Sequence, residues 1–417
     1  MEIVVLANKY KSHHFKNLEK HFVNRFIYEE SYNPEKILQH NPDLVICFDE
    51  HWCELGYAIS AIRKKGIATL QVMDGILEWR RTWDYEWEGH KIDGVINPIN
   101  QPVLSHKIAC LGKTDTRILE SWGNFGKCEI IGAARLDHLL HKYTCSSTTR
   151  KIDNNKKKKI LVMTAKKAGF TRDQILLTTK ALIDLNSYFN KRKDIDVIWR
   201  VTQDLDTCLG IKNTLSDFAG KELHTILENV DAVITTPSTS LIEAMLINKP
   251  VSLIDYHNCP HYFEAAWNIF SQNHIDQVVN ELLNPPLSRI EYQNFLLSEH
   301  LVLLPDATNR LTRLIEEMLK IKKQSNNMEL LFPIRIIDDK ELFNSNTVLR
   351  GEFSDYYPEF PISSEKSKKE LELELSSALG TIFILNQKYE YILKRLYSIP
   401  GFRFLKKIFQ RYFKEIH

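Results

Sequence analysis

Short apolar runs alternate with longer mixed segments through the first third of the chain. The runs typical of buried strands lie at 2–7, 43–48, 67–73, 94–96, 107–111 and 128–131. Between two of them, residues 55–65 have the apolar spacing of a helix that is closed by Gly66. This repeated order of strand and helix predicts a parallel, doubly wound sheet, and hence a Rossmann-like domain over residues 1–149.

The alternation starts again at residue 160. We expect strands at 160–163, 196–201 and 251–254, helices at 173–189, 222–228 and 241–247, and helices throughout 263–323. A second Rossmann-like domain is therefore predicted over residues 160–325. The expected fold class is α/β, with two doubly wound domains facing each other across a cleft and further helices at the C-terminal end.

Three segments differ from these two blocks. Residues 150–159 hold six basic residues and one acid without interleaved aromatics, which favours an exposed linker over a nucleic-acid patch. Residues 326–398 are irregular at first and then helical and charge-rich. In 399–417, apolar residues recur at spacings of three and four while five cations face a single acid. This pattern predicts a basic amphipathic helix, which suits either an anionic membrane surface or docking on the protein itself.

Composition restricts the function classes. A formal net charge of +2 over 417 residues gives no general reason to expect nucleic acid. No apolar run reaches the roughly 18 residues of a transmembrane helix, and the first residues turn polar too soon for a signal peptide. Seven cysteines without a CxxC pair indicate reduced thiols in a cytoplasm and no zinc site. Neither GxGxxG nor a P-loop is present, which counts against dehydrogenases and P-loop NTPases.

The segment 231–256, DAVITTPSTSLIEAMLINKPVSLIDY, predicts a strand, a phosphate-sized turn, a helix and a second strand. Hydroxyl side chains at 238–240 are suited to cap the helix. The start of such a helix presents free backbone N–H groups and the positive end of its dipole, which suits a diphosphate. Glu243, one turn further on, could then reach a ribose diol. An ordinary capped helix in a βαβ unit is the alternative.

The order of several short motifs resembles a known family. They are QVMDG at 71–75, IGAARLD at 131–137, the strand at 160–164, and ITTPSTS at 234–240 followed by Glu243 and Lys249–Pro250. Together they are similar to the GT-B glycosyltransferases, in the branch with the CDP-glycerol glycerophosphotransferases and related bacterial surface-carbohydrate transferases. The resemblance covers roughly residues 1–320 and implies two Rossmann-like domains, the first for an acceptor and the second for a nucleotide donor.

This sequence departs from the branch at four positions. Asp74 stands where the branch has a histidine, Ala134 where it has a proline, and Thr202 where a histidine is expected. Glu243 replaces an aspartate of the polyol-phosphate enzymes and is closer to the ribose-binding glutamate of sugar transferases. These differences favour glycosyl transfer over polyol-phosphate transfer.

Asp74 is the candidate base or nucleophile, because it follows an apolar strand and precedes Gly75, on a loop at the carboxyl end of the strand. An ordinary Asp-Gly turn is the alternative. Asp49 and His51 follow another strand and are further catalytic candidates, although a solvated loop is equally consistent.

Binding roles are predicted for two further groups. Those expected to hold the donor nucleotide and its phosphates are Arg135, Thr164, Lys166, Arg200, Pro237, Ser238, Thr239, Ser240 and Glu243. Those expected to hold the acceptor are Glu78, Trp79 and Arg80. The alternative is that their loop only packs on the protein surface.

No metal or other cofactor is expected. Asp338–Asp339 lies outside both domains, and a loop with His257, Cys259 and His261 is usually not a metal site. Helix N-termini and basic residues can stabilise a leaving phosphate without one.

The predicted function is a glycosyltransferase that moves a sugar from a nucleotide-sugar to a surface-polysaccharide or lipid-linked glycan. The alternatives are a CDP-polyol phosphotransferase of the teichoic-acid type, a nucleotide-sugar 2-epimerase, and a non-catalytic nucleotide-sugar-binding subunit. The expected partners are the donor, the acceptor and an anionic membrane contacted by the tail, without nucleic acid. The expected location is the cytoplasm, peripherally on the inner face of the cell membrane.

Overall fold

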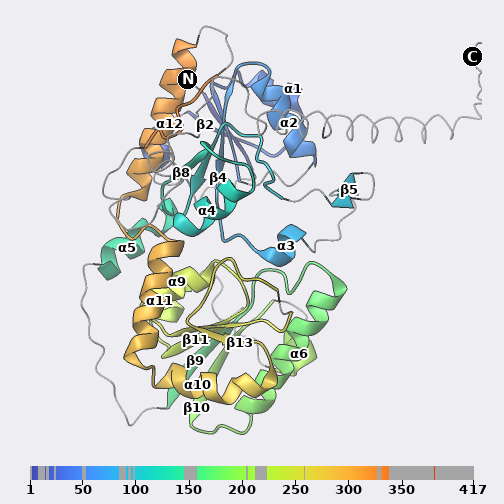
Figure 1. Ribbon diagram of the computed structural model, residues 1–417, viewed down its shortest axis with the longest axis vertical. Coiled ribbons are helices and arrows are strands. Elements are labelled where there is room, and N and C mark those ends of the chain that lie inside the picture. Colours follow the sequence, from blue (N-terminus) through green and yellow to red (C-terminus); the bar gives the residue numbers. More distant parts are fainter. Residues whose placement is uncertain are drawn as a thin grey trace, which may run out of the picture.

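Two parallel sheets lie one above the other in the computed structural model (Figure 1). It describes residues 2–7, 15, 18–22, 25–48, 53–83, 91–92, 95–96, 99–144, 157–202, 205–211, 223–257, 259–325, 330–337 and 380. Most of the predicted linker, the predicted tail helix and Asp338–Asp339 lie outside these residues. Among the helices that are described, none combines the length and the apolar character needed to cross a bilayer.

The first sheet is parallel and has the strand order β2-β1-β3-β4-β7-β8. Its strands are β1 (Ile3–Leu6), β2 (Phe26–Glu29), β3 (Leu44–Cys47), β4 (Ala68–Val72), β7 (Lys107–Cys110) and β8 (Cys128–Ile130). The run predicted at 94–96 lies elsewhere, in a small antiparallel hairpin of β5 (Lys91–Ile92) and β6 (Val95–Ile96).

The second sheet is also parallel, with the order β10-β9-β11-β12-β13. Its strands are β9 (Lys158–Met163), β10 (Ile195–Arg200), β11 (Ala232–Thr235), β12 (Val251–Ile254) and β13 (Trp267–Ile269). The prediction of helices throughout 263–323 is wrong at β13. A three-residue apolar strand has no period that separates it from a buried helical segment.

Helices cover both sheets. In the first half they are α1 (Pro34–Gln39), α2 (Cys53–Arg63), α3 (Trp79–Trp83), α4 (Lys113–Ser121) and α5 (Asp137–Thr144). In the second half they are α6 (Arg172–Phe189), α7 (Leu205–Leu209), α8 (Leu223–Leu227), α9 (Ser240–Leu246), α10 (Ile275–Leu283), α11 (Leu287–His300) and α12 (Ala307–Gln324). Single 3-10 turns occur at Leu18–Lys20, Ala134–Leu136 and Gln272–His274. Together with the two sheets, these helices give the predicted α/β, doubly wound architecture.

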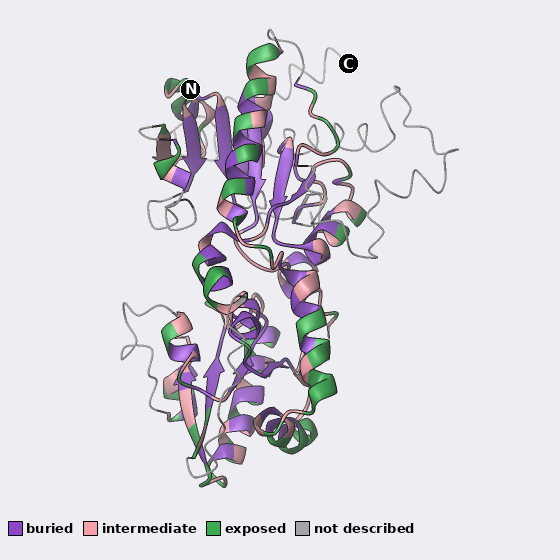
Figure 2. Cartoon of the chain, turned by 90° about the vertical axis from the view of Figure 1, so that its left-hand side faces the viewer, coloured by how far each residue is buried: buried purple, intermediate pink, exposed green. Residues whose placement is uncertain are grey.

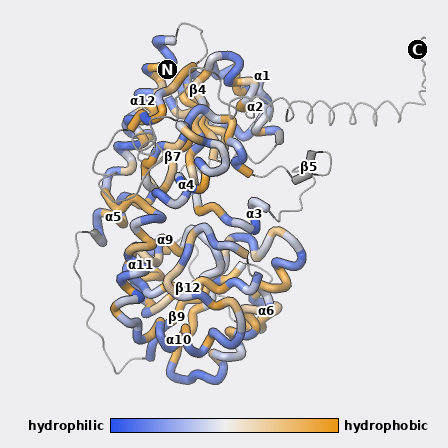
Figure 3. Tube along the Cα trace, in the orientation of Figure 1, coloured by the Kyte–Doolittle hydropathy of each residue, from blue (hydrophilic) through white to orange (hydrophobic). Residues whose placement is uncertain are grey.

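Both faces of each sheet are buried, as continuous apolar strands require. In β1, Ile3 and Val5 face one core cluster, while Val4 and Leu6 face the other. Purple buried strands accordingly run through both halves in Figure 2, and exposed residues lie on the outer sides of the helices. The hydrophobic stretches of the chain lie inside both domains (Figure 3).

The two domains share buried surface. One apolar cluster contains Met73 and Leu77 of the first half together with Leu241 of α9 and Phe263 of the second. Such a shared core fixes how the carboxyl ends of the two sheets face each other.

Helix α12 lies along the first sheet, although it follows the second one in sequence (Figure 1). Leu311, Leu314 and Met318 of this helix are in the same cluster as Ile3 and Val5. The predicted second domain, residues 160–325, therefore includes a helix that packs on the first sheet. Local sequence does not predict this packing, because the apolar face of a helix does not show which sheet it will contact.

Candidate active site between the domains

The strand order of the second sheet marks the place where a ligand crevice is expected. From β9 the sheet grows to one side through β10 and to the other through β11, and ligands of doubly wound sheets bind outside the carboxyl ends of the strands at such a switch point. Thr164 follows β9, and the turn from Thr236 to Ser240 follows β11. The predicted donor residues of these two segments are therefore neighbours in space.

Hydrogen bonds join the two loops at the crevice. The Thr236 hydroxyl accepts from the backbone N–H of Ala165 at 2.7 Å, and the Thr236 N–H donates to the Met163 carbonyl at 3.2 Å. The Thr164 hydroxyl accepts from Thr202 N–H at 2.9 Å. Thr164 thus has a positioning contact already, while Lys166 is exposed beside it and Arg200 is half-buried at the end of β10.

Helix α9 begins at Ser240, one residue earlier than predicted, and its capping also differs from the prediction. Thr239 is the N-cap residue and makes no side-chain capping bond. Ser238 accepts from Ser240 N–H at 3.1 Å, and the Ser240 hydroxyl lies 3.3 Å from that of Thr235. The Thr239 hydroxyl instead accepts a hydrogen bond from the first domain.

The loop after β4 touches the start of α9. The backbone N–H of Ile76 donates to the Thr239 hydroxyl at 3.3 Å. A Cβ on Gly75 would lie 2.6 Å from the same oxygen, so any other residue here would force the Thr239 side chain to move. Half-buried Asp74 precedes this contact directly, which places it at the junction of the two carboxyl edges.

Two predicted donor residues from different domains form an ion pair. Arg135 lies in the 3-10 turn after β8, and its guanidinium donates to Glu243 of α9 at 2.7 Å. The side chains are 21% and 13% exposed, so both are partly accessible to solvent. The pair brings one positive and one acceptor group together at the first turn of α9.

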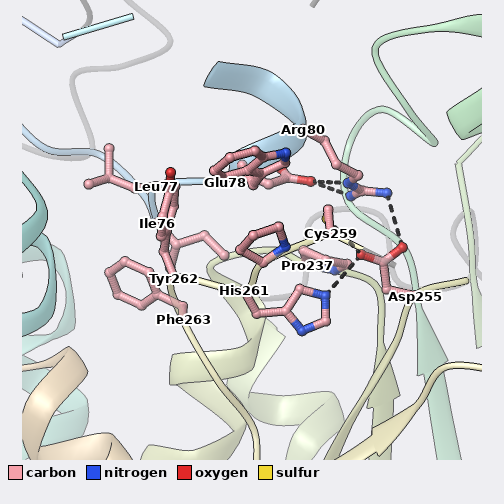
Figure 4. A pocket seen from close by; sticks show the side chains of 12 residues that line it. Ile76, Leu77, Glu78, Arg80, Pro237, Asp255, Cys259, His261, Tyr262 and Phe263 are labelled. Atoms are coloured by element: carbon pink, nitrogen blue, oxygen red, sulfur yellow. Dashed lines mark hydrogen bonds and ion pairs between the residues drawn. The ribbon is translucent and has the colours of Figure 1, made fainter. Parts of the chain in front are cut away.

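The three predicted acceptor residues lie at the start of α3 and just before it. Arg80 is 2% exposed, and its guanidinium contacts the carboxylates of Glu78 in the first domain and, at 3.8 Å, Asp255 at the end of β12 (Figure 4). The Trp79 ring lies tilted against that of Trp83, with ring centroids 5.4 Å apart. These groups form an interdomain contact in this structure.

Tyr262 completes this contact from the second domain. Its hydroxyl accepts from the Trp83 indole at 2.8 Å, and its ring lies 6.0 Å from that of Trp79 and 5.6 Å from that of Trp122. Aromatic rings in such edge-to-face and tilted arrangements bury much apolar area with a polar tip.

A narrow pocket lies beneath these residues. It is lined by residues 76–80 of the first domain and by Pro237, Asp255 and residues 259–263 of the second (Figure 4). Burial raises the pKa of the Glu78 carboxyl despite its contact with Arg80. Burial also acts to raise the pKa of Asp255, but the His261 hydrogen bond and the charge of Arg80 outweigh it and hold that pKa below its usual value.

Asp255 and Tyr262 were not predicted from the sequence as site residues. Asp255 ends the strand VSLI, where carboxylates commonly face a crevice, and that position was the available signal. Nothing in the sequence pairs residue 255 with residue 80. The predicted catalytic candidates Asp49 and His51 lie outside the described residues.

Comparison with known proteins shows similarity in fold only. No protein-family model and no curated protein matches the sequence. The wall teichoic acid polymerase TagF is similar with a TM-score of 0.51 and 13% identity, over 78% of this chain and 90% of that one. S. aureus MnaA with UDP has a TM-score of 0.48 and 15% identity, over 77% and 97% of the two chains. The UDP-GlcNAc 2-epimerase of Neisseria meningitidis bound to UDP-GlcNAc has a TM-score of 0.47 and 12% identity, over 77% and 100%. The resemblance to the GT-B fold is thereby confirmed.

Proposed function

We propose that this chain is a glycosyltransferase that takes a sugar from a nucleotide-sugar and transfers it to a surface-polysaccharide or lipid-linked glycan. The observation that carries the proposal is the contact between Ile76 and Thr239, where the carboxyl edges of the two doubly wound domains meet. A donor bound at the second domain's switch point would have its reacting carbon beside a carboxylate of the first domain, Asp74.

The donor phosphates would lie at the start of α9. Backbone N–H groups of residues 238–240 and the side chains of Arg135, Lys166 and Arg200 would stabilise the charge on the leaving nucleotide. Glu243 would accept from the ribose hydroxyls, with its ion pair to Arg135 fixing its orientation. This arrangement needs no metal for the departure of the nucleotide.

Asp74 would act on the sugar side of the reaction. As a base it would take the proton of the acceptor hydroxyl while that oxygen attacks the anomeric carbon and the nucleotide leaves. As a nucleophile it would form a glycosyl intermediate that the acceptor then displaces, which retains configuration. An acceptor role for Glu78, Trp79 and Arg80 stays a prediction, and it requires their interdomain contacts to open.

The second candidate is a CDP-polyol phosphotransferase. It is favoured by the motif resemblance and by the similarity in fold to TagF, whose solved form was soaked with CDPG. Against it stands Asp74, which occupies the position where the branch has a histidine.

The experiment is a thermal-shift screen with UDP, GDP, dTDP, CMP and CDP, followed by product analysis with the sugar forms of the nucleotide that binds. A ligand at a hundredfold excess over its Kd stabilises by about 2.7 kcal/mol, so a shift is readily measured. Transfer of the sugar to a glycan acceptor supports the proposal. Release of CMP with polyol-phosphate transfer supports the second candidate. Sugar inversion at carbon 2 without acceptor identifies an epimerase, and binding without turnover identifies a non-catalytic subunit.

The membrane location is proposed on the tail pattern. A basic amphipathic helix over 399–417 would hold the enzyme on an anionic inner leaflet, where lipid-linked acceptors are found.

A further inference from the structure

Three metal-ligating side chains converge beside the interdomain pocket. The ligand atoms of Asp255, Cys259 and His261 all lie within 4.8 Å of one another. Asp255 is held at the end of β12, and the other two come from the loop that leads to β13. No metal site was expected here, because a loop with two histidines and one cysteine at this spacing is usually not one, and Asp255 was not predicted to join it.

The carboxylate of Asp255 divides its two oxygens between different partners (Figure 4). Oδ1 accepts from the backbone N–H of His257 at 3.1 Å and lies 3.8 Å from the Arg80 guanidinium. Oδ2 lies 3.0 Å from His261 Nε2 and 3.7 Å from Cys259 Sγ. Oδ1 thus contacts groups that cannot bind a metal, a backbone N–H and a guanidinium, whereas Oδ2 faces two potential metal ligands, an imidazole nitrogen and a sulfur.

These separations match those between ligands of one tetrahedral ion. With metal–oxygen and metal–nitrogen bonds of about 2.0–2.1 Å and a metal–sulfur bond of about 2.3 Å, tetrahedral neighbours lie roughly 3.3–3.6 Å apart. The two distances from Oδ2 are within a few tenths of an ångström of these values. Only small side-chain shifts would place a metal between the three groups.

The local charge also suits a cation. The carboxylates of Glu78 and Asp255 face Arg80, and the charge of Arg81 also acts on Glu78. When Cys259 binds a metal it does so as thiolate and releases its proton to solvent, which adds a negative charge beside Asp255. The bound cation then lies between two anionic ligands, the Asp255 carboxylate and the Cys259 thiolate.

We propose that Asp255, Cys259 and His261 bind a divalent transition-metal ion, Zn²⁺ being the one that this donor set suits best. Thiolate and imidazole ligands select zinc-like ions over Mg²⁺ and Ca²⁺, which prefer oxygen alone. Three protein ligands leave a fourth position, and the side chains lie on the pocket wall next to Pro237. That position takes water or an anionic oxygen of a bound ligand. The inference does not depend on the proposed glycosyl transfer.

The test measures metal on the full chain. After treatment with a chelator, the protein is titrated with Zn²⁺ in competition with a chromophoric chelator, and separately with Co²⁺ while the absorption spectrum is recorded. We expect about one ion per chain and a thiolate-to-cobalt charge-transfer band. Cys259→Ser should abolish that band and, like His261→Gln, weaken Zn²⁺ by more than the 10–100-fold typical of losing an outer partner of a ligand.

Matched controls are Cys208→Ser, which changes an exposed cysteine of α7, and His141→Gln, which changes an exposed histidine of α5. Both should bind like the parent, and circular dichroism should show all variants folded. Absence of a stoichiometric ion, absence of the cobalt–thiolate band, or equal affinity in the parent and Cys259→Ser would each overturn the proposal. None of these readouts requires enzyme activity, so the proposed function can fail without affecting the result.

Discussion

Asp74 is the residue on which the proposed chemistry depends most. It lies in the loop after β4, two residues before Ile76, whose N–H donates to the Thr239 hydroxyl at the start of α9. We expect Asp74→Asn to reduce transfer by about 100-fold or more, the contribution typical of a positioned general base, while the donor nucleotide still binds. Single-turnover kinetics and calorimetric titration separate the two effects. Transfer within about threefold of the parent would reduce Asp74 to a turn residue and move attention to Asp49.

At the residue scale, local sequence found part of the site. Glu243 and the hydroxyls before it were predictable because a strand, a hydroxyl-rich turn and an apolar helix lie within 26 consecutive residues, 231–256. The partner of Glu243 was not predictable as a partner. Arg135 was singled out separately, and only the fold brings it within 2.7 Å. No pattern in the sequence predicts the contact of Arg80 with Asp255, because the two residues are 175 positions apart (255 − 80) and come from α3 and from the end of β12.

At the element scale, the last residue of α11, His300, contacts the first turn of α4. The Thr114 hydroxyl of α4 lies 3.0 Å from the His300 Nδ1, and the backbone N–H of Glu264 donates to the His300 Nε2 at 3.1 Å. A Cβ on Gly112, just before α4, would lie 2.7 Å from the His300 carbonyl group, so the approach requires glycine. His300 therefore joins the two domains.

This contact predicts a pH dependence. Burial lowers the pKa of His300 to about 4, against 6.5 for the free group. Between these values the unfolded chain binds the proton and the folded chain does not, so the free energy of unfolding falls as pH falls from about 6.5 to about 4. Each pKa unit corresponds to about 1.4 kcal/mol. Melting temperatures across this range should fall less in His300→Gln than in the parent. The same fall in both would show that His300 is not the group responsible, and His141→Gln is the exposed control.

Strands β7 and β8, at one edge of the first sheet, hold the segment that follows α12. Lys107 is fully buried, and its ammonium donates to Glu129 at 2.7 Å and to the carbonyls of Pro333 and Ile334. Glu129 in turn accepts from the backbone N–H of Ile336 at 2.8 Å. Both strands thereby fix the chain at 330–337.

Glu129→Gln should lower the free energy of unfolding by about 3–5 kcal/mol, because it leaves the Lys107 charge buried without a counter-charge. Urea denaturation measures the change, with Glu316→Gln on the exposed side of α12 as the control. A loss of less than about 0.5 kcal/mol, as for an ordinary surface change, would contradict this role for the pair.

The strongly patterned elements were the predictable ones. Residues 251–254 form β12 as predicted, and residues 173–189 lie within α6, because a long apolar run or a clear period leaves one interpretation. The strand β13 has only three residues, so its pattern was absorbed into the neighbouring helices. The packing of α12 on the first sheet depends on tertiary contacts, which local periodicity does not contain.

At the scale of the whole molecule, the proposed tail helix would link the two domains to the proposed membrane location. Deleting residues 399–417 should release the protein from anionic liposomes and leave activity on a soluble acceptor largely unchanged. Each cation near an anionic surface contributes about 1 kcal/mol, and salt screens this attraction. Cosedimentation at low and high salt measures it. A matched variant with Arg403, Lys406 and Lys407 changed to Gln keeps the apolar stripe and should bind more weakly. A full-length chain that never sediments, together with a sharp loss of melting temperature on deletion, would show that the helix is part of the fold.

The nucleotide-donor site proposed at the start of α9 is tested most directly by a nucleotide titration. The parent, Glu243→Gln, Ser240→Ala and the control Glu316→Gln are titrated calorimetrically with the nucleotide that gives the largest thermal shift. A hydrogen bond to a charged group contributes about 1.5–3 kcal/mol, so Glu243→Gln should bind about tenfold or more weakly, Ser240→Ala less tightly than the parent, and Glu316→Gln like the parent. Equal affinity in all four proteins would contradict the donor site at α9.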